Sequence, residues 1–338
     1  MVQVVSPNNI KMEPTDVIIV GAGLTGLTLA KDLTDKGVDF ILLEARERIG
    51  GRIHSIKTED GAVVEMGATW FFPNFNSLGH LLKKLKIDLT EQYGEHGMYR
   101  IKGGTGNIVD TLHSQMDQSK ILLGQKVTHI KQTEEGMEVI SNGKVFQSSR
   151  VVTTVPPHLL SRSVQFSPAL PQDVMTVMRS THTWMGEAVK GAVTYKTPFW
   201  KTSGWSGAIY SYSGPFVQAY DQSNEEGGAL VGFMSGRVGR LPFEERKKKV
   251  IAQLVDTLGE EASDYLEYRD TVWSQEQFTT PSSAPTPHQH QNNGHSIYQN
   301  PLMGGGLIVG GTETSSRAGG YMEGAVNSAK KIASMLTK

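Results

Sequence analysis

Three glycines near the start of the chain are spaced to hold a phosphate group. Gly21, Gly23 and Gly26 form a G-x-G-x-x-G turn directly after the apolar run 17–20. The first glycine permits a tight turn, the second lets the backbone approach a pyrophosphate, and the third lets the next helix pack closely on the strand. Free N–H groups at that helix's N-terminus favour an anion. The pattern therefore predicts a dinucleotide-binding turn.

An acidic residue at the expected distance completes this unit. The first helix is predicted over 27–36, Gly37 ends it, and a second strand over 39–44 closes with Glu44. A carboxylate there accepts hydrogen bonds from ribose hydroxyls and disfavours a phosphorylated ribose, and hence NADP. A glycine turn alone is weak evidence, but a flanking strand, a helix and an acid together are not explained by a merely structural turn.

A second glycine-rich stretch lies near the other end of the chain. Gly310-Gly-Thr-Glu-Thr314 leads into Gly319-Gly-Tyr-Met-Glu-Gly324, and together with the first motif it suggests a flavin. Met322 is expected to start the last helix, whose N-terminus would stabilise the negative charge of a reduced flavin. Arg46 and Arg52 follow the second strand as charge partners for a pyrophosphate or as solvated loop residues.

Composition limits the partners of the chain. The 338 residues leave room for two domains, and a net charge of −1 argues against nucleic acid or an anionic membrane as the main partner. The absence of cysteine excludes disulfides, thiolate metal sites and a cysteinyl link to a cofactor. Residues 1–15 lack the apolar core of a signal peptide, and no apolar run is long enough to span a membrane. We therefore expect a cytoplasmic protein.

The remaining pattern predicts a mixed α/β chain with a mostly β insertion. The stretch 62–70 is a strand and turn in which Gly67 and Ala68 leave room for a flat ring, and 121–155 alternates as a β-meander. Other elements are expected as helices over 78–89, 243–258 and 320–336, a helix opened by 103–107, and strands over 188–195, 207–212, 229–234 and 307–310. The charged run 244–249 is most simply a solvated helix face. Residues 1–76, 101–157 and 296–338 would form the dinucleotide-binding domain, and 77–100 and 158–295 a substrate domain.

These motifs, in this order over nearly the whole chain, resemble the flavin-containing amine oxidase family, which includes monoamine, polyamine and L-amino-acid oxidases. The residues that carry the resemblance are Gly21–Gly26, Glu44–Arg52, Gly67–Trp70, Lys190 within 187–191, Phe199-Trp200, Trp273, Gly311–Thr314 and Gly320–Ala325. The resemblance implies an α/β fold in which a Rossmann-like FAD-binding domain carries an inserted, mostly β substrate domain. FAD would be noncovalent.

The resemblance also assigns roles to individual residues. It implies that FAD is bound by Gly21, Gly23, Gly26, Glu44, Arg46, Gly51, Arg52, Gly67, Ala68, Thr69, Trp70, Val127, Glu313 and Met322, with Val127 near the adenine. For the reaction it implies Lys190, Tyr321 and Trp273. In the family the lysine holds a water at the flavin N5 and supports reoxidation by dioxygen. A ring such as Tyr321 orients the amine, whereas Trp273 shapes the pocket.

The chain departs from the family pattern in two places. In covalent members of the family, a segment after the strand tryptophan supplies a flavin-linking cysteine and a second aromatic wall. When that segment is aligned without gaps from Trp273, the two positions are Ser282 and Ser283. They lie in the stretch 281–294, which we expect to be a mobile loop. His288 and His290 lie there, but two histidines are too few for a metal site, and none is expected. In addition, few residues separate 78–89 from Gly103, where family members place a long helical part of the substrate domain. The site should therefore be open. An open site could take a bulky amine, could be roofed by a second subunit in a homodimer, or could serve a reaction other than simple amine oxidation.

The expected function is oxidation of an amine carbon–nitrogen bond by hydride transfer to flavin, with dioxygen as the acceptor. Two alternatives stay open. One is a desaturase or porphyrinogen-type oxidase acting on carbon–carbon bonds, which Lys190 and Tyr321 disfavour. The other is a noncatalytic flavin-binding protein that has lost its substrate roof.

Overall fold

The chain folds into two compact units. The computed structural model describes residues 13–59, 61–225, 227–281 and 286–337. Unit 1 comprises Met1–Gly51, Val109–Trp184 and Ser283–Lys338, and unit 2 comprises Arg52–Ile108 and Met185–Ser282. Each unit is built from separate stretches of sequence, and the units differ from the expected domains at residues 52–76, 101–108, 158–184 and 283–295.

Unit 1 is organised around one eight-stranded sheet. Its order is β12-β9-β10-β11-β1-β2-β8, with β18 paired to β11. The strands are β1 (Thr15–Val20), β2 (Phe40–Leu43), β8 (Ile121–Leu122), β9 (Val127–Thr133), β10 (Gly136–Ser141), β11 (Lys144–Thr153), β12 (Gln165–Ser167) and β18 (Leu307–Val309). β1 is parallel to both β2 and β11, while β9, β10 and β11 form the predicted antiparallel meander. The expected Rossmann-like α/β class is confirmed.

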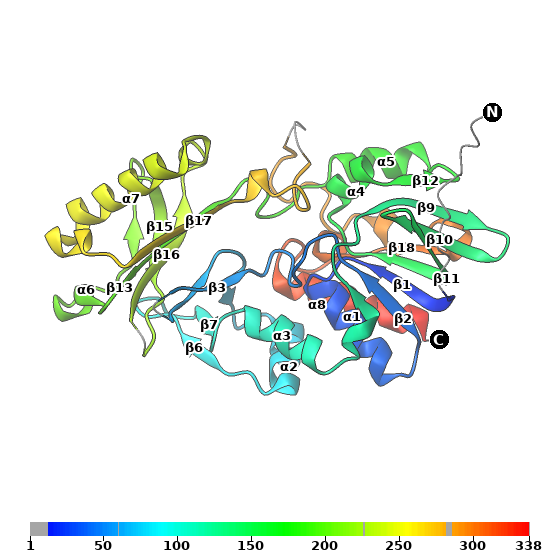
Figure 1. Ribbon diagram of the computed structural model, residues 1–338, viewed down its shortest axis with the longest axis horizontal. Coiled ribbons are helices and arrows are strands. Elements are labelled where there is room, and N and C mark those ends of the chain that lie inside the picture. The colour runs from blue at the N-terminus through cyan, green and yellow to red at the C-terminus, as the bar shows by residue number, and fades with distance from the viewer. Residues whose placement is uncertain (1–12, 60, 226, 282–285, 338) are drawn as a thin grey trace, which may run out of the picture. The chain divides into compact units, whose positions relative to one another are not determined.

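Helices cover both faces of this sheet. Figure 1 shows α1 (Leu24–Asp35) and α8 (Met322–Leu336) on one side, and α4 (Pro157–Ser163) and α5 (Gln172–Arg179) on the other. The α4 and α5 side contains a buried apolar core in which Leu160 and Met178 pack against strand residues such as Ile130 and Val139. A further helix, α3 (Gly106–Ser114), leads back into this unit.

Unit 2 contains a five-stranded antiparallel sheet of order β14-β15-β16-β13-β17. These strands are β13 (Val189–Tyr195), β14 (Ile209–Tyr210), β15 (Phe216–Asp221), β16 (Gly228–Met234) and β17 (Glu267–Val272). Trp200 of α6 (Phe199–Thr202) and Leu254 of α7 (Phe243–Leu258) pack on one face of the sheet. The other face meets Val64 and Met66. Val64 lies in β4 (Val63–Glu65), which forms a hairpin with β3 (Ser55–Lys57), and Met66 directly follows β4.

A three-stranded sheet carries the shortened part of unit 2. It pairs β5 (Trp70–Phe71), β7 (Tyr99–Ile101) and β6 (Leu89–Glu91) next to α2 (Asn76–Leu85) in the sequence. The helix predicted over 78–89 is therefore too long. It stops because Lys86 takes a left-handed conformation (φ 57°) and the buried Ile87 donates its N–H back to the Leu82 carbonyl, which is a helix-ending arrangement.

The charged run of α7 also differs from its prediction. Arg246 is buried, and its guanidinium donates to both carboxylate oxygens of Asp270, at 2.7 and 2.9 Å. It faces β17, a strand that was not predicted because Asp270 interrupts its apolar pattern. A buried charge is stable only with such a partner, so this one member of the run turns inward.

Close packing at Gly26 can be tested by substitution. A Cβ on Gly26 would lie 2.0 Å from the Gly21 carbonyl oxygen, whereas a Cβ on Gly79 of α2 would make an ordinary 3.5 Å contact with the Phe71 ring. Gly26→Ala should lower the free energy of unfolding by about 1–3 kcal/mol and reduce the flavin content of the purified protein. Gly79→Ala, the matched helical control, should raise the unfolding free energy by up to about 1 kcal/mol. Equal urea-unfolding curves for the two variants would contradict this account.

Candidate active site

The glycine turn of unit 1 presents a bare helix N-terminus. Gly23 is the N-cap of α1, no side chain caps it, and the first turn holds no acid. The next glycine pair lies against this turn: Gly50 forms a β-bridge with Gly23 and donates its N–H to the Ala22 carbonyl at 2.8 Å. Gly51, at φ 59°, is the second of this pair. Because the first N–H groups of a helix lack partners within it, this end is suited to a pyrophosphate.

Glu44 lies beside the same turn. The carboxylate accepts the backbone N–H groups of Ala22 and Arg46, each at 2.8 Å, and is 4% exposed. The Arg46 guanidinium lies 4.0 Å from it. A carboxylate has further lone pairs, so Glu44 can also accept ribose hydroxyls. The residues present therefore fit the adenosine part of a dinucleotide, and the predicted contacts of Glu44 and Arg46 with it stay predictions.

The second glycine-rich stretch is joined to the start of α8. Thr312 donates its hydroxyl to the Tyr321 carbonyl at 2.6 Å and accepts the Gly320 N–H at 3.0 Å. Tyr321 is the N-cap of α8, and Met322 is its first residue. Glu313 is fully buried. Val127, expected near the adenine, starts β9 in the same unit and is buried.

Unit 2 holds the other predicted flavin residues around Lys190. Lys190 lies on β13 with no exposed surface, and its Nζ donates to the Gly67 carbonyl at 2.9 Å and to the Thr69 hydroxyl. The Nζ also lies 5.0 Å from the Trp70 ring and 5.1 Å from the Phe233 ring. Two oxygens and two ring faces thus surround the Lys190 Nζ.

Segment 66–69 is itself fixed by its neighbours. A Cβ on Gly67 would lie 2.0 Å from the Arg52 carbonyl oxygen, and Ala68 donates its N–H to the same oxygen at 3.0 Å. Trp273 is fully buried and donates its indole N–H to the Met66 carbonyl at 2.7 Å. Trp273 therefore acts on this site through the backbone that it holds, and direct participation in the reaction stays a prediction.

Burial and a nearby buried carboxylate together set the electrostatics of Lys190. Glu65 accepts the Thr105 N–H at 2.6 Å, the Thr105 hydroxyl at 2.5 Å and the Ser55 hydroxyl at 2.9 Å. Burial raises the pKa of Glu65. Burial also lowers the pKa of Lys190 to about 7, against the opposing attraction of Glu65. Glu65 was not predicted from the sequence, because Thr105 and Lys190, which act on its carboxylate, are distant from it in the chain.

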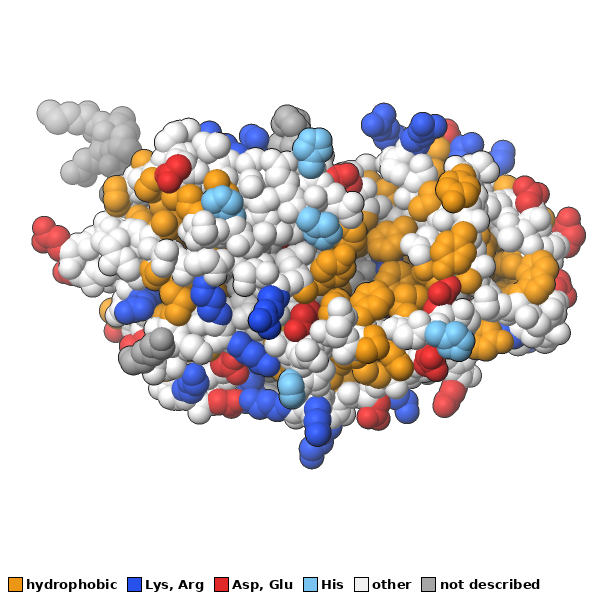
Figure 2. Space-filling view, turned by 180° about the vertical axis from the view of Figure 1, so that it is seen from behind, with side chains coloured by type: hydrophobic (Ala, Val, Ile, Leu, Met, Phe, Trp, Pro, Cys, Tyr) orange, Lys and Arg blue, Asp and Glu red, His pale blue; other side chains and the backbone are white. Residues whose placement is uncertain are grey.

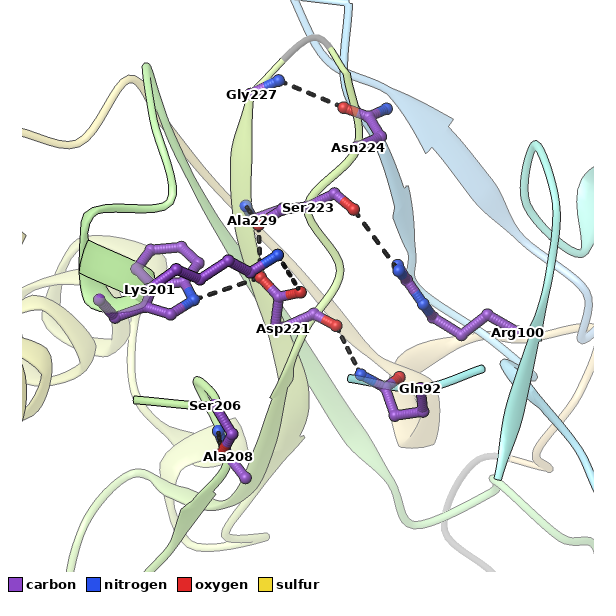
Figure 3. A network of polar contacts seen from close by, with 11 residues as sticks. Gln92, Arg100, Lys201, Ser206, Ala208, Asp221, Ser223, Asn224, Gly227 and Ala229 are labelled. Carbon is purple, nitrogen blue, oxygen red and sulfur yellow. Dashed lines mark hydrogen bonds and ion pairs between the residues drawn. The ribbon is translucent and has the colours of Figure 1, made fainter. Parts of the chain in front are cut away.

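Trp70 is anchored by a polar network, and Figure 3 shows the part of that network around Asp221. The Trp70 indole N–H donates to the Gln92 side-chain oxygen at 3.2 Å. The Gln92 amide in turn donates to the Asp221 carbonyl at 2.7 Å. The Asp221 carboxylate, almost fully buried, pairs with Lys201 at 3.0 Å and accepts the Trp200 indole N–H at 3.2 Å. The network joins the β6–β7 turn to β15, so the position of the Trp70 ring depends on Asp221.

Tyr321 has two aromatic neighbours that the sequence did not predict. His290 stacks on Tyr321 with ring centroids 5.8 Å apart and an interplanar angle of 23°. Trp184 stacks on His290 at 5.3 Å and 11°, and lies 5.8 Å from Tyr321. Ser282 and Ser283 lie outside the described residues. No cluster of three metal-ligating side chains is found in the part of the chain that the structure describes.

The shortened region is a plain β-turn connection. Residues 86–98, all described, contain β6 and turns but no helix. Tyr93, Trp205 and Tyr210 are exposed in this unit. Figure 2 shows hydrophobic side chains gathered on its right half, over the part that carries α7 and β13–β17 in Figure 1. None of the described helices is long and apolar enough to cross a membrane.

Comparisons with known proteins agree with this geometry. Residues 24–99 and 89–336 match the family model of flavin-containing amine oxidoreductases. The chain is 24% identical to flavin-containing amine oxidase B of Sus scrofa over 447 aligned positions, covering 94% of this chain and 85% of the relative. Putrescine oxidase bound to putrescine has a similar fold, with a TM-score of 0.83, 21% identity and coverage of 96% and 99%. Cyclohexylamine oxidase from Brevibacterium oxydans also has a similar fold, with a TM-score of 0.84 and 19% identity, and the match covers 96% of this chain and 98% of that one.

A glycine turn suited to a dinucleotide in unit 1 and a buried lysine beside Gly67 in unit 2 fit a flavin-dependent oxidoreductase. The chain belongs to the flavin-containing amine oxidoreductase family. It is therefore an enzyme of the flavin-dependent amine oxidase type, with FAD as its cofactor.

The buried charge of Lys190 should make stability depend on pH. The pKa of a lysine falls from 10.5 in the unfolded chain to about 7 at this site, so only the unfolded chain binds the proton between these values. The native state therefore loses stability as pH falls from 10 to 7. Lys190→Met has no such group and should not show this loss. The unfolding free energy of the variant minus that of the wild type should therefore be larger at pH 7 than at pH 10, by on the order of a few kcal/mol. Denaturant titrations at pH 7, 8.5 and 10 measure it. Lys196→Met, at an exposed lysine, should show no such trend, and a difference for Lys190→Met that stays constant with pH would reject the assignment.

Proposed function

We propose that this enzyme oxidises the carbon–nitrogen bond of an amine and uses dioxygen as its electron acceptor. Bound FAD supplies a two-electron acceptor. The amine loses a hydride and a proton to become an imine, which water hydrolyses to a carbonyl compound and the released amine or ammonia. Dioxygen receives the two electrons and, with two protons, becomes hydrogen peroxide. The observation that carries this proposal is the buried Lys190 amino group beside Gly67 and Thr69.

Each named residue has a defined part in this proposal. The N-terminus of α1 and Glu44 bind the pyrophosphate and the ribose. The Lys190 Nζ holds a water, because Gly67 and Thr69 take two of its positions; as a neutral amine it accepts a hydrogen of the water, and as an ammonium group it donates to the water oxygen. Tyr321 presents its ring to the amine nitrogen, where a ring face favours positive charge. Arg52, Ala68 and Trp70 line the flavin.

The reaction is tested by anaerobic mixing with a panel of amines. At least one amine should bleach the yellow enzyme, and air should restore the colour with formation of hydrogen peroxide. Because residues 86–98 contribute no helix over the exposed aromatic side chains of unit 2, small amines should be weakly oriented. We expect kcat/KM for aryl or long-chain amines to exceed that for butylamine by roughly tenfold or more, about 1.4 kcal/mol of transition-state binding.

Two results would count against these statements. Bleaching by no amine would reject amine oxidation and leave a carbon–carbon desaturase or a noncatalytic flavoprotein. Equal kcat/KM for butylamine and every larger amine would reject the open site alone. Activity per subunit that rises with protein concentration would show that a second subunit closes the site.

The role of Lys190 is tested by separating the two half-reactions. Lys190→Met should slow reoxidation of the reduced enzyme by dioxygen by about tenfold or more, while reduction by amine changes less. Stopped-flow absorbance at the flavin band measures both rates, with Lys196→Met as the control. Wild-type reoxidation in Lys190→Met, at normal flavin content, would remove Lys190 from the mechanism.

A further inference from the structure

Unit 1 contains a cavity of about 170 Å³ beside α8 that has no part in the proposed reaction. Its other walls come from β18 and from the stretches 298–300 and 314–317. α8 contributes four residues with the spacing of one helix face, namely Ser328, Lys331, Ile332 and Met335. Among the described residues that line the cavity, none is a residue that the family resemblance assigns to FAD or to the reaction.

The cavity is large enough for one ring-sized apolar group. An engineered apolar cavity of about 150 Å³ binds benzene, and this one has a similar volume. Val309, Ile332 and Tyr298 in its walls are all buried, and the Tyr298 hydroxyl lies 2.5 Å from the Thr181 hydroxyl. These side chains therefore offer a fixed apolar surface to a small aryl or alkyl group.

The charged residues of the lining have one sign. Arg317 and Lys331 are cationic, and none of the described lining residues is acidic. The two hydrogen bonds of Arg317 with the Ser315 hydroxyl, at 2.7 and 3.3 Å, use its carbonyl and its N–H, so its guanidinium has no partner among the described residues. Burial lowers the pKa of Lys331. An anion would therefore meet two cations here and no carboxylate that repels it.

The walls of the cavity are joined before any ligand enters. The Lys331 Nζ donates to the Gln299 side-chain oxygen at 2.5 Å and to the Gln299 carbonyl at 3.3 Å. The Gln299 amide donates to the Thr314 carbonyl at 3.2 Å, and the Thr314 hydroxyl lies 3.3 Å from the Ser328 hydroxyl. These contacts connect α8 with the stretches 298–300 and 314–317. A ligand then has little protein to order, which favours binding.

We propose that this cavity is a binding site for a small organic anion, in which a carboxylate or phosphate group is attached to an aryl or short alkyl body. The planar guanidinium of Arg317 suits two oxygens of either anionic group, and Lys331 adds a point charge. The apolar body packs on Val309, Ile332 and Tyr298. This inference goes beyond the proposed function and does not depend on it, because the two use different residues.

Calorimetric titration of the purified flavin-loaded protein tests the ligand class. The probes are benzoate, phenylphosphonate, benzamide and inorganic phosphate. Benzamide has the shape of benzoate without its charge, and phosphate has a charge without an apolar body. Benzoate or phenylphosphonate should bind with a Kd of about 1 mM or lower. Benzamide and inorganic phosphate should bind at least about tenfold more weakly.

Substitutions at exposed residues locate the site. Arg317→Gln should weaken binding of the better anion by about tenfold or more, because it removes the bidentate partner. Lys331→Gln should weaken it by about threefold, since the Lys331 Nζ is already engaged by Gln299. Lys330→Gln, at the exposed neighbour on α8 that does not line the cavity, is the matched control and should bind as the wild type does. Flavin content and thermal unfolding show that each variant is folded.

Four results would overturn the inference. The first is no binding of benzoate or phenylphosphonate at about 10 mM. The second is equal binding of benzamide, which would remove the role of charge, and the third is equal binding of inorganic phosphate, which would remove the role of the apolar body. The fourth is an unchanged Kd in Arg317→Gln, which would place the ligand elsewhere. None of these measurements uses turnover, so amine oxidation is judged separately.

Discussion

The buried amino group of Lys190 is the constraint on which unit 2 depends. A buried polar group, and still more its charged form, is costly unless oxygens and ring faces surround it. Gly67 and Thr69 supply the oxygens, and Trp70 and Phe233 supply the rings. These partners come from a turn after β4, from β5 and from β16, so the group can be stable only when all three lie together. Segments far apart in the sequence are thereby tied to one side chain.

This constraint accounts for where residues 52–76 belong. The sequence placed them with the dinucleotide domain, because their glycine turn resembles a flavin contact. In the structure Val64 and Met66 pack on the sheet of unit 2, and the Trp273 indole holds the Met66 carbonyl. Glu65, between those two apolar residues, points to Thr105 and Ser55 instead. The alternation of the strand thus puts apolar residues on the sheet and the carboxylate in a polar pocket.

What could be predicted from the sequence depends on the distance over which a contact acts. The glycine turn and the placement of Glu44 beside it could be predicted, because Glu44 accepts the Ala22 N–H from only 22 residues away within one βαβ unit. The helix over 243–258 was predicted correctly, because the spacing of its apolar residues is a property of that stretch alone. Arg246, in that helix, was wrongly predicted to be solvated, because its partner Asp270 lies on β17, outside the helix. Residues 281–294, which include His290, were expected to form a mobile loop because they are rich in Pro, Ser, Asn and His. The contacts of the His290 ring with Trp184 and Tyr321 were not predicted, because no spacing in the sequence encodes them.

The short connection between α2 and β7 is held by polar contacts and not by the burial of apolar side chains. Gln92 bridges Trp70 and the Asp221 carbonyl, Tyr210 donates its hydroxyl to Glu95 at 2.6 Å, and Lys201 lies 4.9 Å from the Tyr93 ring. Hydrogen bonds of this kind fix direction but cover little surface, so Tyr93 and Tyr210 stay exposed. The open aromatic surface of unit 2 is therefore a fixed feature of the fold. Any substrate that uses it gains contact area from rings that are already positioned, without having to order the loop that carries them.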